Sequence, residues 1–213
     1  MSIAEQLENI KNKLPQTVTL VAVSKTKSHE EILAAYTEGQ RVFGENRVQE
    51  LSEKAKKLPT DIQWHMIGHL QRNKVKDIAP FVSLIHAVDS IKLLKEINKR
   101  AIQNNRVINC LLQVHIAKEE TKFGFEEHEI KEVLVAASTF NNIKIIGLMG
   151  MATFTKNNNQ IKEEFKTLKI IFDSIKDRNI NTLSMGMSGD YPIAIEQGST
   201  MIRVGSAIFG HRN

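Results

Sequence analysis

Two glycine–serine segments near the C-terminal end carry residue types that bind anions. The first is residues 185–190 (MGMSGD), and the second is residues 203–210 (RVGSAIFG). Each segment follows a short apolar run and leads into a stretch that can become helical. Glycine lets the backbone approach an anion closely, serine adds a hydroxyl donor, and exposed N–H groups at a helix start complete the site. Two such segments in one chain predict a bound phosphate group.

Lys25 ends the apolar run at residues 18–24 (VTLVAVS). A lysine at the inner end of an apolar strand is partly desolvated, which disfavours its charged form and favours a nucleophilic amine. Such an amine can form a Schiff base with a carbonyl group. Most lysines that flank a strand point to water, and this alternative stays open for Lys25 taken alone. A phosphate site together with a Schiff-base lysine indicates pyridoxal 5′-phosphate (PLP), which carries a phosphate and an aldehyde.

Arg203 and Asn46 are candidate contacts to the ring of such a cofactor. Arg203 lies two residues before Gly205, and an inward side chain could face the pyridine nitrogen. Because arginine keeps its proton, it leaves the ring a weak electron sink, whereas a carboxylate would keep that nitrogen protonated. A structural ion pair with a carboxylate such as Asp190 is the alternative for Arg203. Asn46 follows the second expected strand, and its alternative role is to cap a helix.

His65 and His69 are four residues apart, a spacing that suits a metal site only on a helix. Gly68 and the strand pattern around it argue against a helix, and no third ligand follows at a metal spacing. We therefore expect these histidines in the core or at the mouth of the fold, with no metal bound. The single cysteine, Cys110, lies in an apolar run and is expected to be a buried strand residue.

Apolar stretches rich in valine and isoleucine alternate with helical patterns along the chain. An N-terminal helix is expected at residues 3–13. Strands are expected at residues 18–24, 41–44, 63–67, 83–87, 108–115, 143–149, 181–185 and 201–204. Helices are expected at residues 29–38, 46–57, 71–78, 91–104, 126–139, 158–178, 189–197 and 206–209.

This alternation predicts an α/β fold, a single (β/α)8 barrel of the TIM type with an extra N-terminal helix, formed by residues 1–213 as one domain. An open doubly wound sheet is the alternative, although no GxGxxG follows the first strand. In a barrel, chemistry belongs at the C-terminal ends of the strands, and phosphate sites often follow strands seven and eight. Both glycine–serine segments fall there, and Lys25 lies at the same mouth.

The composition bounds the class of protein and its partners. A chain of 213 residues with 41% hydrophobic and 25% charged residues can bury one sizeable core. The net charge is +5, but the lysines are scattered rather than interleaved with aromatic residues, so no nucleic-acid partner is expected. The apolar runs are too short to cross a bilayer, and the N-terminal residues lack the apolar core of a secretion signal. We expect a cytoplasmic monomer without a membrane partner.

These segments resemble those of a known family, the pyridoxal phosphate homeostasis proteins of the YggS/PROSC type. The resemblance covers nearly the whole chain and runs through several motifs in the same order. They are residues 21–25 (VAVSK), 43–50 (FGENRVQE), 64–74 (WHMIGHLQRNK), 121–125 (TKFGF), 147–149 (GLM), 184–190 (SMGMSGD) and the C-terminal stretch 194–210. Arg47 departs from the pattern, because a tyrosine or a similar residue is common at that position.

The resemblance implies a PLP-binding barrel similar to the N-terminal domain of alanine racemase, with Lys25 as the Schiff-base lysine. It also implies a pyridine contact from Arg203 and a ring contact from Asn46. Phosphate contacts are implied for Ser188, Gly189, Gly205 and Ser206. Members of the family are thought to buffer and deliver PLP, with effects on vitamin B6 balance and without established turnover.

The expected function is therefore PLP homeostasis without a catalytic residue, with apo forms of PLP-dependent enzymes as recipients. One alternative is an enzyme of the amino-acid racemase type. Racemisation needs acid–base groups on both faces of the ring, and the second tyrosine of alanine racemase looks like a contribution from an extra domain that this chain has no residues to form. A Schiff-base aldolase acting on a phosphorylated sugar is another alternative. Whether Lys122 or another lysine holds a second PLP stays open.

Overall fold

The computed structural model describes residues 1–119 and 123–210, and its strands form a closed parallel barrel. Each strand pairs with its neighbours in the sequence, and the last pairs with the first. The strands are β1 (Thr19–Val23), β2 (Val42–Glu45), β3 (Gln63–Met66), β4 (Leu84–Val88), β5 (Ile108–Gln113), β6 (Ile143–Met149), β7 (Thr182–Met187) and β8 (Met201–Val204). The predicted (β/α)8 fold is confirmed, and the closure rules out the open doubly wound sheet.

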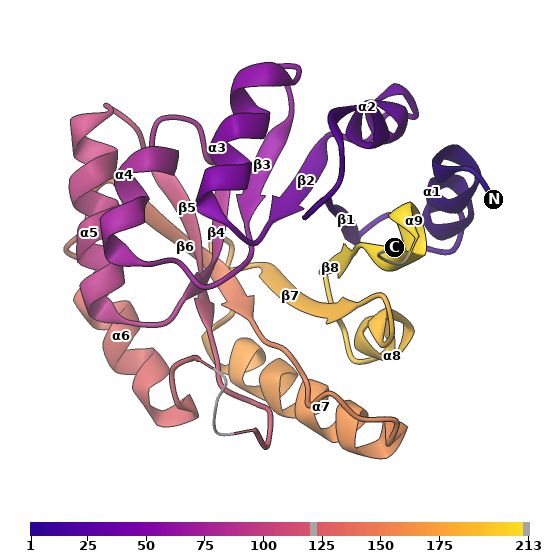
Figure 1. Ribbon diagram of the computed structural model, residues 1–213. Coiled ribbons are helices and arrows are strands. Elements are labelled where there is room, and N and C mark those ends of the chain that lie inside the picture. The colour runs from indigo at the N-terminus through magenta and orange to yellow at the C-terminus, as the bar shows by residue number, and fades with distance from the viewer. Residues whose placement is uncertain (120–122, 211–213) are drawn as a thin grey trace.

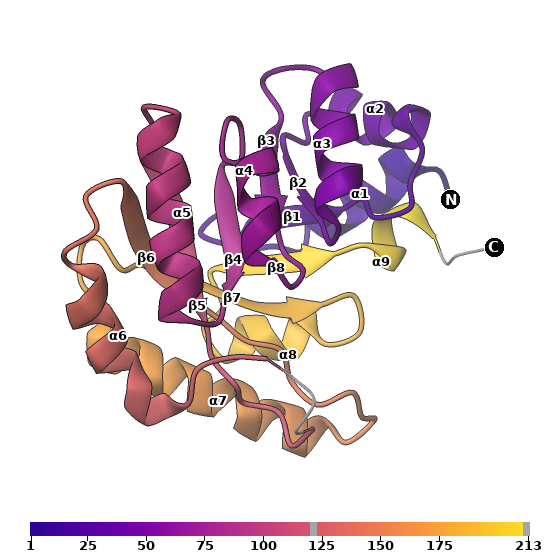
Figure 2. The same ribbon diagram turned by 60° about the vertical axis from the view of Figure 1, so that its left-hand side comes forward.

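Helices alternate with the strands and cover the outside of the barrel (Figures 1 and 2). The α-helices are α1 (Ile3–Lys11), α2 (His29–Thr37), α3 (Val48–Lys57), α4 (Val75–Ile78), α5 (Ile91–Gln103), α6 (Ile130–Ala137), α7 (Asn158–Ile175), α8 (Tyr191–Glu196) and α9 (Ser206–Phe209). The extra N-terminal helix α1 packs beside α9 (Figure 1). Within the residues described, no helix has the length and apolar character needed to cross a membrane.

Local sequence signals set the ends of several helices. Ser28 Oγ accepts the N–H of Glu31 at 3.2 Å and the Glu31 carboxylate accepts the N–H of Ser28 at 2.8 Å, which is a capping box at the start of α2. Ser90 caps α5 by accepting the N–H of Leu93 at 3.3 Å. Gly39, with φ +79°, follows the end of α2 in the left-handed conformation that glycine adopts without strain.

Many of the predicted boundaries differ from the observed ones by a few residues, and two of the differences affect the type of helix or the extent of a loop. The short 3₁₀ helices η1 (Arg72–Lys74) and η2 (Glu127–Glu129) lead into α4 and α6, where continuous α-helices were expected. Strand β7 continues to Met187, so the first glycine–serine loop begins at Ser188 and not at Met185. Met187 pairs with Arg203 of β8 beyond a register shift, and this pairing extends the strand.

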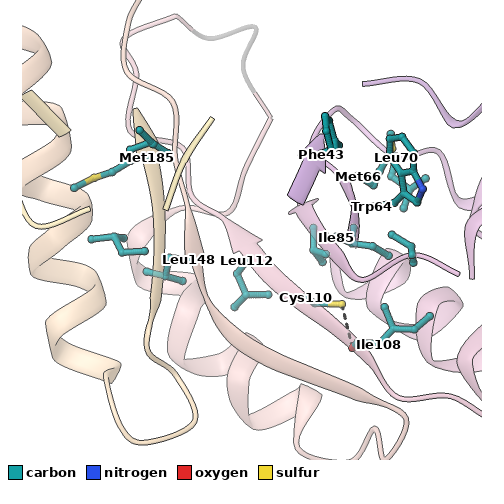
Figure 3. Close-up of a cluster of buried hydrophobic side chains, with 14 of the residues drawn as sticks. Phe43, Trp64, Met66, Leu70, Ile85, Ile108, Cys110, Leu112, Leu148 and Met185 are labelled. Atoms are coloured by element: carbon teal, nitrogen blue, oxygen red, sulfur yellow. Dashed lines mark hydrogen bonds between the residues drawn. The ribbon is translucent and has the colours of Figure 1, made fainter. Parts of the chain in front are cut away.

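The hydrophobic core has two parts, separated by the wall of the barrel. One part lies between the strands and the helices, and Figure 3 shows some of it, including Phe43, Trp64 and Cys110. The other part fills the barrel interior with Val21, Leu84, Ala87, Leu111, Met149 and Met201. Cys110 is fully buried, and burial raises the pKa of its thiol to about 12, so the predicted inert strand residue is confirmed.

Candidate functional site

A pocket of about 510 Å³ lies at the C-terminal mouth of the barrel. Its lining includes all seven residues predicted from the sequence, which come from the ends of β1, β2, β7 and β8. They are Lys25, Asn46, Ser188, Gly189, Arg203, Gly205 and Ser206. The structure therefore brings the predicted residues together. The other lining residues are Val23, Ile67, residues 151–155, Ile161, Met187 and Asp190.

Lys25 lies two residues beyond the end of β1. Side chains alternate along a strand, and Val21 packs in the barrel interior while Ala22 packs in the outer core against the helices. The same alternation puts Val23 and Lys25 on the inner side, and both line the pocket. Lys25 is half-buried there, as expected for an amine at the mouth of the barrel.

The two glycine–serine loops are joined by a hydrogen bond. Gly205 N–H donates to Ser188 Oγ at 3.1 Å. Among the described residues, the N–H groups of Ser188, Gly189 and Ser206 find no acceptor, so they are available to a ligand. The helices that follow these loops have six and four residues, so the groups that could bind an anion here are backbone N–H groups and serine hydroxyls rather than a helix dipole.

Gly189 and Gly205 differ in what surrounds them. A Cβ added to Gly189 would meet nothing within 4 Å, because the residue faces open space at the pocket. A Cβ on Gly205 would lie 3.2 Å from the Val23 carbonyl oxygen, because this loop packs tightly against the end of β1. Glycine at position 205 therefore keeps the second loop close to Lys25.

Arg203 is buried on β8 and is held by the neighbouring strand β7 and by the residue that follows β6. Its Nη1 donates to Ser184 Oγ at 2.6 Å, and its Nη2 donates to the Gly150 carbonyl at 3.0 Å. Burial lowers the pKa of the guanidinium to about 10, and the nearby Asp190 carboxylate opposes that shift. Arg203 thus stays charged at neutral pH. Asp190 attracts it, as the ion-pair alternative supposed, while Ser184 and Gly150 supply the hydrogen bonds that hold it.

A chain of buried polar side chains continues from Arg203 across the barrel interior. Ser184 Oγ lies 3.1 Å from His86 Nδ1, and His86 Nε2 lies 3.0 Å from His65 Nδ1. Because Arg203 can only donate, the chain is fully satisfied when the Ser184 hydroxyl donates to His86 and His86 donates to His65. Burial lowers the pKa of His65 to about 3 and that of His86 well below its usual range, so both rings are neutral near pH 7.

The structure places the two histidines considered in the sequence, His65 and His69, in different surroundings. His65 is buried in the barrel, whereas His69 is exposed at the mouth, with Nδ1 3.0 Å from the Asp89 carboxylate. The two do not converge, and residues 1–119 and 123–210 contain no group of three or more His, Cys, Asp or Glu residues that could hold a metal. The sequence reasoning missed the role of His86, although its two-residue spacing from Leu84 on β4 could have placed it inside the barrel.

Asn46 lines the pocket with an unsatisfied polar atom. Its Oδ1 is buried without a hydrogen-bond partner among the described residues. The capping alternative is wrong, because the N-cap of α3 is Arg47, which makes no side-chain capping bond. A buried amide oxygen without a partner is costly, so this position fits a ligand that donates a hydrogen bond. Lys122, the candidate for a second site, lies outside the described residues.

Comparison with known protein families matches the whole chain to one of them. A family model described as alanine racemase, N-terminal domain, matches residues 1–213. The pyridoxal phosphate homeostasis protein of Aquifex aeolicus is 41% identical over 198 residues, which is 91% of this chain and 86% of that protein. The protein of the same name from Helicobacter pylori is 42% identical over 195 residues, which is 90% of this chain and 87% of that protein.

Solved structures with the same architecture fall into two groups. PipY of Synechococcus elongatus, solved with PLP bound, is 35% identical and has a TM-score of 0.90 over 98% of this chain and 100% of that chain. The structure of PipY without PLP gives a TM-score of 0.93 at 34% identity, over the same shares of the two chains. Alanine racemase from E. faecalis is 16% identical with a TM-score of 0.74 over 99% of this chain and 58% of that chain, a likeness of fold alone.

Proposed function

The chain belongs to the family of pyridoxal phosphate homeostasis proteins, and on that premise we propose that it binds PLP in the pocket at the barrel mouth. It holds the cofactor as a Schiff base on Lys25 for buffering or delivery and does not turn over amino acids at an enzymatic rate. Residues 1–213 act as one domain, a cytoplasmic monomer. Apo forms of PLP-dependent enzymes are its recipients.

One observation carries the proposal: seven residues with the chemistry that PLP needs, from four separate strand ends, line one pocket. The unpaired N–H groups of Ser188, Gly189 and Ser206 fit a phosphate. The buried Asn46 oxygen without a partner fits a ring hydroxyl. Lys25 supplies the amine, and PLP supplies the aldehyde that condenses with it. PipY, 35% identical to this chain, was solved with PLP bound, which supports the same ligand here.

Arg203 favours holding the cofactor over chemistry on it. In our proposal its guanidinium faces the pyridine nitrogen, held by Ser184 and Gly150. A guanidinium cannot take the place of a protonating carboxylate, so the ring remains a weak electron sink. The wall at residues 151–155 (MATFT) adds thioether, methyl, hydroxyl and phenyl groups, which are not bases for proton abstraction.

The experiment is a PLP titration followed by borohydride reduction. We expect an absorbance band characteristic of a Schiff base and, after reduction and mass spectrometry, a pyridoxyl group on Lys25. Lys25→Ala should lose the band, and Lys57→Ala, which changes an exposed lysine on α3, should keep it. A protein that takes up no PLP, or that carries it on other lysines, would contradict the proposal.

Two further measurements separate a carrier from an enzyme. In a transfer assay, the PLP-loaded protein should pass PLP to an apo-enzyme faster than the same concentration of free PLP does. Incubation with L- or D-alanine should give no racemisation above that of free PLP. Turnover at an enzymatic rate would favour the racemase alternative, for which the shared barrel of the alanine racemases is the specific observation. Size-exclusion chromatography would test the proposal that the protein is a monomer.

A further inference from the structure

A buried ion cluster lies behind Lys25, on the side of β1 away from the pocket. Its members, called here the Lys54 cluster, are Ser24, Glu45, Glu50 and Lys54. Lys54 Nζ, reaching in from α3, is 2.6 Å from Glu50 Oε1, 2.8 Å from Glu45 Oε1 and 2.7 Å from the Ser24 carbonyl oxygen. All three ammonium protons therefore have an acceptor.

The Lys54 cluster holds the main chain on both sides of Lys25. Before it, Ser24 is tied twice, because its carbonyl accepts from Lys54 and its hydroxyl donates to Glu45 Oε1 at 2.6 Å. After it, Thr26 N–H donates to Glu50 Oε1 at 2.5 Å. Lys25 is thus the residue between two anchored neighbours, and its own side chain lies at the pocket.

Thr26 has a backbone conformation that requires such an anchor. Its φ is +64°, in the left-handed region that a β-branched residue rarely adopts. Surrounding contacts must hold a residue in this conformation. The bond from Thr26 N–H to Glu50 is a direct restraint of that kind, and it sets the direction in which the chain leaves Lys25.

Stability alone does not account for the Lys54 cluster. Glu45 and Lys54 have side-chain exposures of 0% and 5%, and Glu45 Oε2 is buried without a hydrogen-bond partner among the described residues. Desolvation raises the pKa of Glu45 despite the hydrogen bond from Lys54. Buried ion pairs add little net stability compared with apolar side chains of the same size, since desolvation opposes their attraction. The better explanation for these buried charges is therefore that they fix the position of the main chain at residues 24–26.

We propose that Lys54, with Glu45 and Glu50, is a positioning residue that presents the Lys25 amine to the aldehyde of PLP. This inference rests on the proposed function. In the step concerned, the neutral amine of Lys25 forms a C=N bond with the aldehyde carbon, the C=O bond breaks, and the oxygen leaves as water with the two protons of the amine. None of the residues of the Lys54 cluster lines the pocket, so the cluster acts through the main chain at Lys25.

The test compares Lys54→Met and Glu50→Ala with matched controls on the same helix. Glu53 and Lys57 form an exposed pair with the same four-residue spacing, 2.8 Å apart, so Lys57→Met and Glu53→Ala are the controls. We expect the two cluster variants to form the borohydride-reducible bond to Lys25 about tenfold more slowly than wild type, because a displaced nucleophile loses its approach geometry. The control variants should react at the wild-type rate, and Lys54→Arg, which keeps the charge, should recover part of the rate.

Two readouts separate positioning from loss of the fold. Affinity for pyridoxine 5′-phosphate, which lacks the aldehyde, should be unchanged in the cluster variants. In the absence of PLP, the rate at which Lys25 is trinitrophenylated, measured by mass spectrometry, should differ from wild type in the cluster variants only. If Lys54→Met fails to fold, Glu50→Ala, at a partly exposed side chain, still decides the question.

The outcomes distinguish the two proposals. Wild-type protein that binds no PLP overturns the proposed function. Wild-type protein that binds PLP on Lys25, with folded cluster variants that react as fast as the controls, overturns the positioning role alone. Equal losses of affinity for PLP and for pyridoxine 5′-phosphate would show that the Lys54 cluster is purely structural, which also overturns it.

Discussion

Arg203 Nη1 donates to the Ser184 hydroxyl at 2.6 Å, and both side chains are buried inside the barrel. This contact joins the pocket to the neutral pair His86 and His65, which lie on the opposite side of Ser184. A buried charge whose hydrogen-bond partner is lost keeps its full desolvation cost. Ser184 therefore stabilises the guanidinium at the wall of the pocket.

Ser184→Ala should weaken both the fold and the binding of PLP. The substitution removes the acceptor of Arg203 Nη1 and the partner of His86 Nδ1 while leaving both groups buried. We expect the free energy of unfolding to fall by about 1–3 kcal/mol, and the affinity for PLP to fall because the guanidinium is less firmly held. Urea unfolding and PLP titration measure the two effects. Ser52→Ala, a partly exposed site on α3, should change neither.

The buried histidines predict how stability depends on pH. An unfolded histidine takes up a proton near pH 6.5, whereas folded His65, with a pKa of about 3, stays neutral. Between these values the unfolded state binds more protons. The contribution of these histidines to the free energy of unfolding is therefore fully present above pH 6.5. It falls as the pH drops toward 3, by up to about 1.4 kcal/mol per pH unit for each buried histidine.

His65→Gln should reduce that slope without abolishing it, because His86 remains buried and neutral. The measurement is urea unfolding at several pH values below 6.5. His128→Gln, at an exposed position, serves as the control and should keep the wild-type slope. An unchanged slope for His65→Gln would mean that His65 takes up its proton in the native state as readily as in the unfolded chain.

The fold could be predicted from the sequence because its signals are local. The alternation of valine-rich runs with helical patterns, and caps such as Ser28 with Glu31, act over a few residues. The two glycine–serine loops could be located for the same reason, since glycine and serine at strand ends are recognised without knowledge of distant contacts, and both loops line the pocket. The predicted end of β7 was wrong, because the last pair of this strand, Met187 with Arg203, depends on the register of the neighbouring strand.

The buried networks could not be predicted, because they depend on which distant positions meet. The contact of His86 with Ser184 crosses the barrel between residues 98 positions apart. Lys54 stands in a highly charged helix, VQELSEKAKK, and its pattern does not distinguish it from the exposed Lys57. Only the packing of α3 against β2 places its ammonium against Glu45. Burial of a charge in this way is decided by tertiary structure, not by local pattern.

Gly147→Ala should be strongly destabilising. A Cβ at this position on β6 would lie 1.7 Å from the Thr182 carbonyl oxygen, which is backbone of the adjacent strand β7 and cannot move without disturbing the pairing. We expect the free energy of unfolding to fall by about 3 kcal/mol or more. Thermal unfolding measures it. A variant as stable as wild type would show that β6 and β7 can separate locally at no cost.

Gly189→Ala should have the opposite effect. We expect the variant to keep its thermal stability but to bind the phosphate group of PLP more weakly. A Cβ here meets nothing within 4 Å, and the backbone is not in the left-handed region, so the thermal stability should match that of wild type. The added methyl group would enter the pocket beside the free N–H groups of the first glycine–serine loop. We expect the affinity for PLP to fall about tenfold, or about 1.4 kcal/mol, while the affinity for pyridoxal, which has no phosphate, stays the same. Parallel titrations with the two compounds measure this difference. Equal losses for both compounds would place the phosphate elsewhere in the molecule.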